Sequence, residues 1–121
     1  MSDNKESIQQ LTNRDAAWRA ELRKAIATPQ RTAIPRARMT ELDPAYRITN
    51  SEEVAQGLTA EQALVEASRC LDCPNPTCVT GCPVNINIPS FIKNIQRGHF
   101  DDAARVLRDT SALPAVCGRV C

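Results

Sequence analysis

Apolar side chains recur at helical spacing in four stretches of the chain, and no stretch alternates between apolar and polar residues as a half-buried strand would. The first stretch runs from Asn4 to Ile26, and its apolar stripe consists of Ile8, Leu11, Trp18, Leu22 and Ile26. Asn13 is suited to cap a second helix and would divide this stretch in two. We interpret Trp18 as the anchor of the segment because an indole ring buries a large apolar area. The pattern predicts an all-α fold that begins with an N-terminal helical segment.

A second helix is predicted from a capping box that runs from Thr59 to Gln62. In this motif the Thr hydroxyl and the Gln side chain each pair with a backbone amide that the first helical turn leaves free. The helix that follows carries Leu64, Ala67 and Leu71 on one face. We expect it to present Cys70 on its last turn, so that the first thiol of the chain lies on a rigid element.

Two more helices are predicted after Pro89, which suits a first helical turn. The first has its apolar face at Ile88, Phe91, Ile92 and Ile95, and Gly98 is its stop signal. The second begins near Phe100 and has Phe100, Ala103, Ala104 and Leu107 on one face. Its acidic first turn and basic last turn match the helix dipole. His99, the one histidine, lies between the two helices and is interpreted as a surface or capping residue.

The stretch from Thr28 to Tyr46 has a different composition, with three prolines, no glycine and no sustained periodicity. Since a residue before proline is driven toward extended conformations, we expect an extended Pro/Arg-rich arm and not a third helix. The stretch contains the basic residues Arg31, Arg36 and Arg38, and Arg47 follows directly after it. We interpret them as a solvated face, with docking onto an acidic neighbouring surface as the alternative. Residues Ser51 to Leu58 are expected to be irregular.

Length and charge narrow the classes of function. A chain of 121 residues suggests one modest hydrophobic core, and one Trp, one Tyr and two Phe leave that core to small aliphatic side chains. The net charge of +1 argues against an electrostatic grip on nucleic acid. No apolar run approaches the roughly 20 residues of a membrane span. The polar start of the sequence, MSDNKESIQQ, has no signal-peptide core, so we expect a cytoplasmic protein without membrane contact.

Cysteines dominate the candidate chemistry. The run CLDCPNPTCVTGCP places Cys70, Cys73, Cys78 and Cys82 at intervals of two, four and three residues, with proline directly after the last thiol. Prolines and a glycine within the run supply turns that can bring thiols toward a common centre. Two further thiols, Cys117 and Cys121, would share a face if their segment were helical.

The thiols are better suited to a metal than to disulfides. Six cysteines without a visible secretory signal favour reduced thiols, and a disulfide scaffold is the alternative. Structural zinc usually takes two well-separated cysteine pairs, whereas this run is crowded and ends in Cys-Pro like a bacterial ferredoxin motif. It departs from that motif by having four residues, not two, between the second and third thiols. An iron–sulfur centre is therefore favoured, and a redox-inactive zinc module for protein interaction is kept as the alternative. A lower-ranked view makes the N-terminal helix and arm an assembly surface.

Three segments carry a closer resemblance. They are PRARMTELDPAYRI, GLTAEQALVEASRCLDCPNPTCVTGCPVNINIPSFIKNIQRGHFDDAARVL and LPAVCGRVC, which together cover roughly residues 35–121. The sequence resembles the N-terminal iron–sulfur domain of the glutamate synthase small (beta) subunit family. That family is related to the dihydropyrimidine dehydrogenase N-terminal domain and to NADPH-linked ferredoxin oxidoreductases. The residues before Thr28 carry no motif of their own.

The resemblance implies an all-α, helical-ferredoxin-like domain with two 4Fe-4S clusters, which relay electrons between a flavin and a partner. By position, Cys70, Cys73 and Cys78 match three ligands of one cluster, and Cys82 and Cys121 match ligands of the other. Cys117 matches a family cysteine that is generally not a ligand. No catalytic acid, base or nucleophile is recognisable, so the resemblance places substrate chemistry elsewhere in an NADPH-dependent oxidoreductase.

The resemblance also implies an organisation that extends beyond this sequence. We expect residues 1–50 to form the N-terminal helix and arm, and residues 51–121 to form the cluster domain. In the family, further cysteines, an FAD domain and an NADPH domain follow. We therefore expect a C-terminally truncated chain with mobile cysteine loops that binds less iron than two full clusters or none, unless a homo-oligomer supplies thiols in trans. The expected partners are the flavin and nucleotide domain of the same parent chain and a large glutamate synthase-type subunit or ferredoxin.

Overall fold

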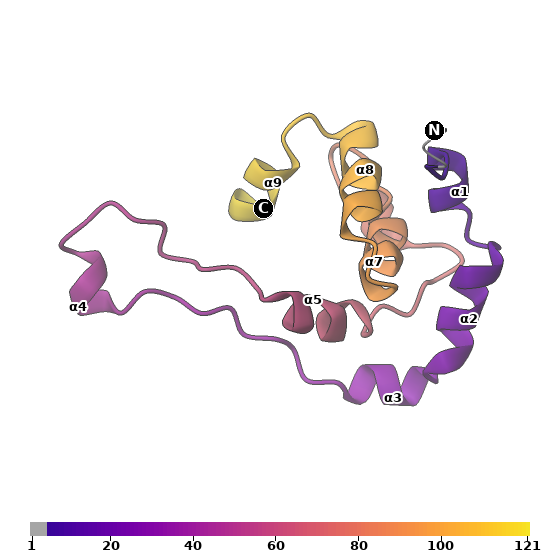
Figure 1. Cartoon of the computed structure of the whole chain (residues 1–121), viewed down its shortest axis with the longest axis horizontal. Helices are drawn as coiled ribbons and strands as arrows, with labels where there is room; N and C mark the ends of the chain where they lie inside the picture. The colour runs from indigo at the N-terminus through magenta and orange to yellow at the C-terminus, as the bar shows by residue number, and fades with distance from the viewer. Residues whose placement is uncertain (1–4) are drawn as a thin grey trace.

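A computed structural model describes residues 5–121, and this part of the chain is helical, without a sheet (Figure 1). The all-α prediction is confirmed. Asn4, where the first helical stretch was expected to begin, lies outside the described residues. The helices are α1 (Ile8–Thr12), α2 (Ala17–Ala25), α3 (Thr28–Ala33), α4 (Pro44–Arg47), α5 (Ala60–Ala67), α6 (Thr77–Thr80), α7 (Ile88–Gln96), α8 (Phe100–Thr110) and α9 (Pro114–Val120).

Helix α7 is the centre of the packing. It lies against α8, and α1, α2, α5 and α6 also contact it. Among residues 5–121, the buried apolar core consists of Leu11, Ala67, Ile86, Ala103 and Val106. In α8 the buried face is centred on Ala103 and Val106, whereas Phe100 is 41% exposed and Ala104 is also exposed. The buried face of α8 is therefore rotated relative to the predicted face. The small core leaves part of the predicted apolar stripe exposed.

Local capping signals determine where the central helices begin and end. Thr59 and Gln62 form the predicted capping box of α5, with a distance of 3.2 Å from the Gln62 amide to the Thr59 hydroxyl. Asn87 caps α7 by accepting a hydrogen bond from the Ser90 amide at 3.3 Å. Gly98 has a φ of 83°, the left-handed conformation that ends a helix, and this confirms the predicted stop. His99 is exposed at the N-cap position of α8, as expected.

The N-terminal stretch is two helices, as expected, but Asn13 divides them without capping the second. Its side-chain oxygen accepts a hydrogen bond from the Asp15 amide at 2.9 Å and forms a turn. The N-cap position of α2 is instead occupied by Ala16, which makes no side-chain cap. Trp18 anchors α2, since the Arg97 guanidinium at the end of α7 lies 3.9 Å from the centroid of the indole ring.

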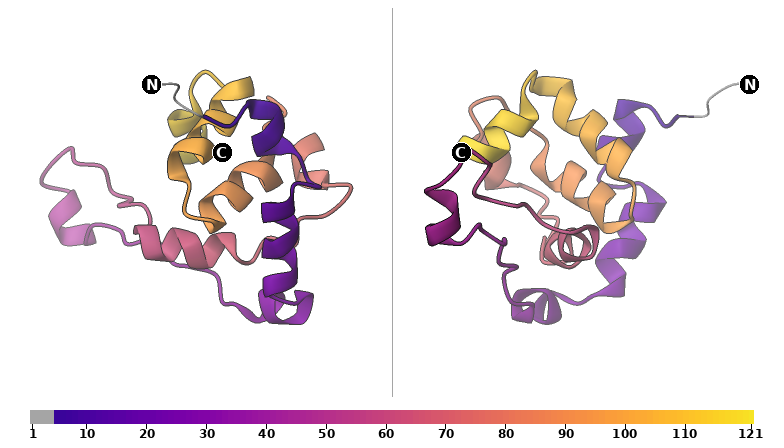
Figure 2. Two further views of the ribbon diagram at one scale, coloured as in Figure 1. Left: turned by 45° about the vertical axis from the view of Figure 1, so that its right-hand side comes forward. Right: turned by 60° about the vertical axis from the view of Figure 1, so that its left-hand side comes forward.

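The arm projects away from the packed helices and carries α4 at its far end (Figures 1 and 2). Two of its segments are helical, α3 and α4, so the expectation of an arm without a helix was wrong. Proline falls in the first turn of each, at Pro29 and Pro44, where its missing N–H breaks no helical hydrogen bond. The rest of the arm is extended. Residues 34–43 form the first limb of the arm and residues 48–59, after α4, form its second limb, and the two limbs meet at an isolated antiparallel bridge between Glu41 and Ala55.

Backbone hydrogen bonds join the two limbs on either side of that bridge. The Leu42 amide donates to the Val54 carbonyl at 2.9 Å, and the Gln56 amide donates to the Thr40 carbonyl at 2.8 Å. Both bonds connect residues on opposite sides of the expected domain boundary between residues 50 and 51. Within residues 5–121, no helix is both long enough and apolar enough to cross a membrane.

Candidate metal centre

The first thiol lies beyond a helix and not on it. Helix α5 ends at Ala67, and Cys70 follows after two tight turns in which the Arg69 amide donates to Glu66 and the Cys70 amide to Ala67. The prediction that Cys70 lies on the last helical turn was therefore wrong by a few residues. The reason is that these hydrogen bonds span three residues, and such bonds narrow the last turn and end the α-helical pattern.

The remaining thiols lie on loops and on two short helices. Cys78 is on α6, Cys82 follows Gly81 after that helix, and Cys73 is exposed on the loop between α5 and α6. Cys121 follows α9, and its amide donates to the Cys117 carbonyl at 3.0 Å, which confirms the predicted helical relation between these two thiols. All six thiols are free.

Two of the predicted ligands meet at one cavity. Cys70 and Cys78 both line a space of about 560 Å³ between α5 and α7. Its other lining residues are mostly apolar: Leu58, Ala63, Glu66, Ala67, Arg69, Ile88, Phe91, Ile92 and Ile95. Cys73, Cys82 and Cys121 are not among them. In the described part of the chain, no three Cys, His, Asp or Glu side chains are grouped closely enough to hold one metal ion.

The donor chemistry nevertheless fits an iron–sulfur cluster. Such clusters are held by cysteine thiolates, and their potential depends on burial and on hydrogen bonds to sulfur. The cavity offers two thiols on an apolar lining, and Cys73 is only three residues from Cys70 on the adjoining loop. The other thiols lie on loops and helix ends.

Buried cations hold the backbone around Cys70. Arg31 of α3 donates to the Ser68 carbonyl at 2.6 Å, and Lys93 of α7 donates to the Cys70 carbonyl at 2.8 Å. Lys93 is fully buried, and its ammonium also donates to the Gln96 side-chain oxygen at 2.8 Å. Burial lowers the pKa of Lys93 from its ordinary value of 10.5 to about 8, although the nearby Cys70 thiol opposes this shift.

Asp72, between the first two thiols, is the most densely paired residue of the site. Its carboxylate is fully buried and accepts from Arg19 at 2.7 Å and from Arg23 at 2.8 Å. Burial by itself would raise the pKa of Asp72, but the hydrogen bonds from Arg19 and Arg23 hold the pKa below its ordinary value. Arg19 also donates to the Ser90 hydroxyl of α7 at 2.7 Å.

Sequence reasoning missed this pairing because the residues before Thr28 carry no motif. Two signals could have indicated it. Arg19 and Arg23 are four residues apart and therefore share a face of α2, and Asp72 is an acidic residue between two apparent ligands. Neither signal shows that these arginines pair with Asp72, since Arg19 and Asp72 are 53 residues apart in the chain.

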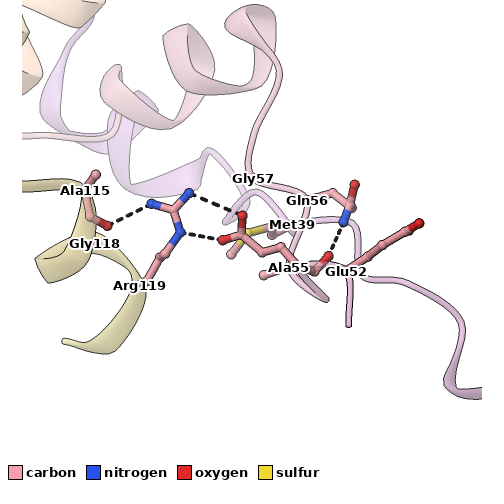
Figure 3. Close-up of a pocket in the computed structure, with 9 residues that line it drawn as sticks. Met39, Glu52, Ala55, Gln56, Gly57, Ala115, Gly118 and Arg119 are labelled. Carbon is pink, nitrogen blue, oxygen red and sulfur yellow. Dashed lines mark hydrogen bonds and ion pairs between the residues drawn. The ribbon is translucent and has the colours of Figure 1, made fainter. Parts of the chain in front are cut away.

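A second cavity lies between the arm and α9, and none of the six cysteines lines it (Figure 3). It encloses about 690 Å³ beside an exposed ion pair in which Arg119 Nε lies 2.5 Å from Glu53 Oε1. The hydrogen bond from Arg119 lowers the pKa of Glu53. Arg119 also donates to the Ala115 carbonyl within α9 at 2.9 Å. This ion pair links the helix that precedes Cys121 to the second limb of the arm.

Residues 47–121, which include all six thiols, match the model of a family described as dihydropyrimidine dehydrogenase domain II, 4Fe-4S cluster. The chain belongs to this family. The family description specifies iron–sulfur and not zinc, so the resemblance drawn from the cysteine run is confirmed. We therefore regard the chain as an iron–sulfur domain, whose individual ligands stay a prediction.

Individual relatives agree with this assignment. The glutamate synthase (NADPH) small chain of Escherichia coli K12 is 42% identical over 69 residues, which are 57% of this chain and 15% of that protein. The same subunit of Azospirillum brasilense is 35% identical over 85 residues, 69% of this chain and 18% of that protein. The NAD-dependent dihydropyrimidine dehydrogenase subunit PreT of Salmonella typhimurium LT2 is 41% identical over 70 residues, 58% of this chain and 17% of that protein. The aligned segments span less than a fifth of each relative.

Proposed function

We propose that this iron–sulfur domain relays single electrons between an FAD site, reduced by NADPH, and a partner site in a glutamate synthase-like oxidoreductase. The observation that carries the proposal is the four-thiol run within the residues that match a 4Fe-4S family. The relatives support it, because their names specify NADPH or NAD and describe a small chain or a subunit. Their names also suggest a role within a larger assembly.

The ligands we propose are the five thiols of the resemblance. Cys70, Cys73 and Cys78 would serve one cluster, and Cys82 and Cys121 would serve the other. A bound 4Fe-4S cluster supplies one-electron transfer with little rearrangement of its ligands. The chain contributes the thiolates, the apolar cavity lining and the buried Lys93, whose positive charge beside Cys70 favours electron-rich states of a nearby cluster.

The proposed partners follow from the same role. They are the flavin and nucleotide domain of a parent protein and a large glutamate synthase-type subunit or a ferredoxin, in the cytoplasm. The projecting arm is a candidate contact, because α4 lies away from the packed helices (Figure 1) and Arg36 and Arg38 are exposed, whereas Arg31 is buried against the packed helices. An acidic partner surface would complement its arginines.

Anaerobic purification of the chain tests the proposal. We expect a brown protein that contains iron and sulfide in equal amounts and gives an electron paramagnetic resonance signal after reduction with dithionite. The matched control replaces Cys70, Cys73, Cys78 and Cys82 by Ser, and it should be colourless. A wild-type chain that is colourless, contains zinc and lacks sulfide would identify a redox-inactive interaction module instead.

A further inference from the structure

The loop between the first two thiols has a backbone that needs support. Asp72 has a φ of 54°, in the left-handed region where a non-glycine residue is disfavoured. Its side chain is also fully buried, so its negative charge is removed from water. Both features are unfavourable unless the surroundings compensate for them. The compensation comes from groups distant in the sequence.

Three arginines of the N-terminal segment surround Asp72 on two sides. Arg19 and Arg23, both on α2, hold the carboxylate, and the Arg19 contact is bidentate, with Nη2 to Oδ1 at 2.7 Å and Nε to Oδ2 at 3.0 Å. Arg14, between α1 and α2, holds the backbone, since its Nη2 and Nε donate to the Asp72 carbonyl at 3.0 and 3.1 Å. The carboxylate and the carbonyl of one residue are thus held independently.

The arginines are themselves held in place. Arg19 donates to the Ser90 hydroxyl at the start of α7 and to the Thr12 carbonyl at the end of α1, at 2.7 and 3.2 Å. Arg23 donates to the Arg14 carbonyl at 2.7 Å. The network therefore connects α1, α2, α7 and the thiol loop. Its arginines precede residues 47–121, so the support comes from outside the segment that matches the iron–sulfur family.

We propose that the N-terminal helices α1 and α2 are a brace that positions the loop between Cys70 and Cys73, and that Asp72 is the positioning residue through which they act. A buried ion pair adds little net stability once desolvation is counted, and its main effect here is to select one loop conformation. That this loop carries cluster ligands rests on the proposed function. The brace itself is a property of the chain.

Hydrogen exchange of the full chain tests the brace. We expect Asp72→Asn and Arg19→Met to accelerate exchange of the backbone amides of residues 70–73, among them the Cys70 amide that donates to the Ala67 carbonyl, by roughly tenfold or more, while amides within α7 and α8 keep their rates. The matched control is Arg119→Met, which removes an arginine from the exposed ion pair with Glu53. It should leave the exchange of the amides of residues 70–73 unchanged.

A milder variant separates a local effect on the loop from global unfolding. Arg23→Gln removes one of the two carboxylate partners from a side chain that is 24% exposed, so it should accelerate the same amides less than Arg19→Met does. Unchanged exchange in all three brace variants, with circular dichroism equal to wild type, would overturn the proposal. So would loss of protection throughout the chain in Arg23→Gln, because the network would then support the whole fold and not the loop.

The same samples separate this proposal from the proposed function. Iron, sulfide and zinc are measured in the wild-type chain, and zinc without sulfide would contradict the electron-relay role without affecting the exchange comparison. If the chain contains iron, we also expect Asp72→Asn to change the paramagnetic resonance line shape of the reduced cluster.

Discussion

At the scale of single residues, the exposed thiol of Cys73 and the half-buried thiol of Cys117 provide a direct comparison. Cys73 is exposed on the loop after Asp72, and we propose that it is a ligand. Cys117 lies on α9 with its sulfur 3.8 Å from the Ser111 hydroxyl, a polar contact that serine can replace. We expect Cys73→Ser to lower the iron content of the anaerobic chain by up to about four atoms, the content of one cluster. Iron and sulfide analysis measures the loss.

Cys117→Ser is the control for that substitution, because it makes the same chemical change outside the cysteine run. It should keep the iron content and the paramagnetic signal of wild type. If Cys117→Ser loses a cluster while Cys73→Ser keeps both metal and signal, the ligand assignment is wrong for this protein.

Lys93 leads to a prediction about alkaline pH. Its pKa is lowered from 10.5 to about 8 in the folded chain, mainly by burial, so between these values the unfolded chain binds more protons than the folded chain. The free energy of unfolding should therefore rise with pH across this interval. Lys93→Met removes the titrating group, and its curve should be flatter.

Urea unfolding of the anaerobic reduced chain at several pH values measures this effect. Because the other titratable groups are the same in the wild type and the variant, the difference between the two curves reports the contribution of Lys93. Parallel curves would contradict the assignment of the pH dependence to this residue.

At the scale of elements, local chemistry explains which helices could be predicted. The boundaries of α5, α7 and α8 follow from short-range signals, namely the box at Thr59, the cap at Asn87 and the left-handed Gly98. Helices α3 and α4 were missed because a proline in a first turn and a proline in an extended arm look alike in sequence. The contacts of Asp72 could not be predicted, since they depend on how α2 packs against the loop.

Two glycines of the same chain should respond to alanine in opposite directions. Gly98 has a φ of 83°, where a Cβ is strained, so Gly98→Ala should destabilise the fold by about 1 kcal/mol or more. Gly118 lies within α9, and a Cβ there meets nothing within 4 Å. Gly118→Ala should favour α9 by roughly 0.5–1 kcal/mol through helix propensity.

Urea midpoints measure the Gly98 effect, and helical circular dichroism together with exchange of the α9 amides measures the Gly118 effect. Because α9 has no buried residue, its gain is expected in local protection more than in global stability. Equal losses of stability in both variants would contradict the prediction, because they would show that glycine is needed at position 118 although a Cβ there has open space.

At the scale of the whole molecule, the arm is attached to the packed helices by a few polar contacts. The Ala37 amide donates to the Glu66 carboxylate of α5 at 2.8 Å, and Arg119 of α9 pairs with Glu53 farther along the arm. The exposed hydrophobic residues of the arm include Met39, Tyr46, Ile48 and Leu58. Since little apolar area fastens the arm, its position should depend on these polar contacts and therefore on pH.

Glu66 allows this dependence to be tested. The hydrogen bond from Ala37 is the main cause that lowers the pKa of Glu66 below 4.5; burial opposes it and Arg69 adds to it. A carboxylate whose pKa is lowered by folding stabilises the native state above its ordinary pKa, and the contribution disappears as pH falls through the folded pKa. We therefore expect the arm to loosen on acidification below about pH 4.5. Because Glu66 is 29% exposed, the contribution should be at most about 1 kcal/mol.

Exchange of the Ala37 amide as a function of pH, corrected for the intrinsic rate, measures the loosening directly. In wild type its protection should fall in acid, whereas Glu66→Gln should give lower protection at neutral pH and no further acid-dependent fall. Glu61→Gln removes an exposed carboxylate from the same helix and should retain the wild-type pH profile at Ala37. If Glu66→Gln reproduces the wild-type profile, other carboxylates control the position of the arm. Glu53 would then be the next residue to substitute, because acid should also release its ion pair with Arg119.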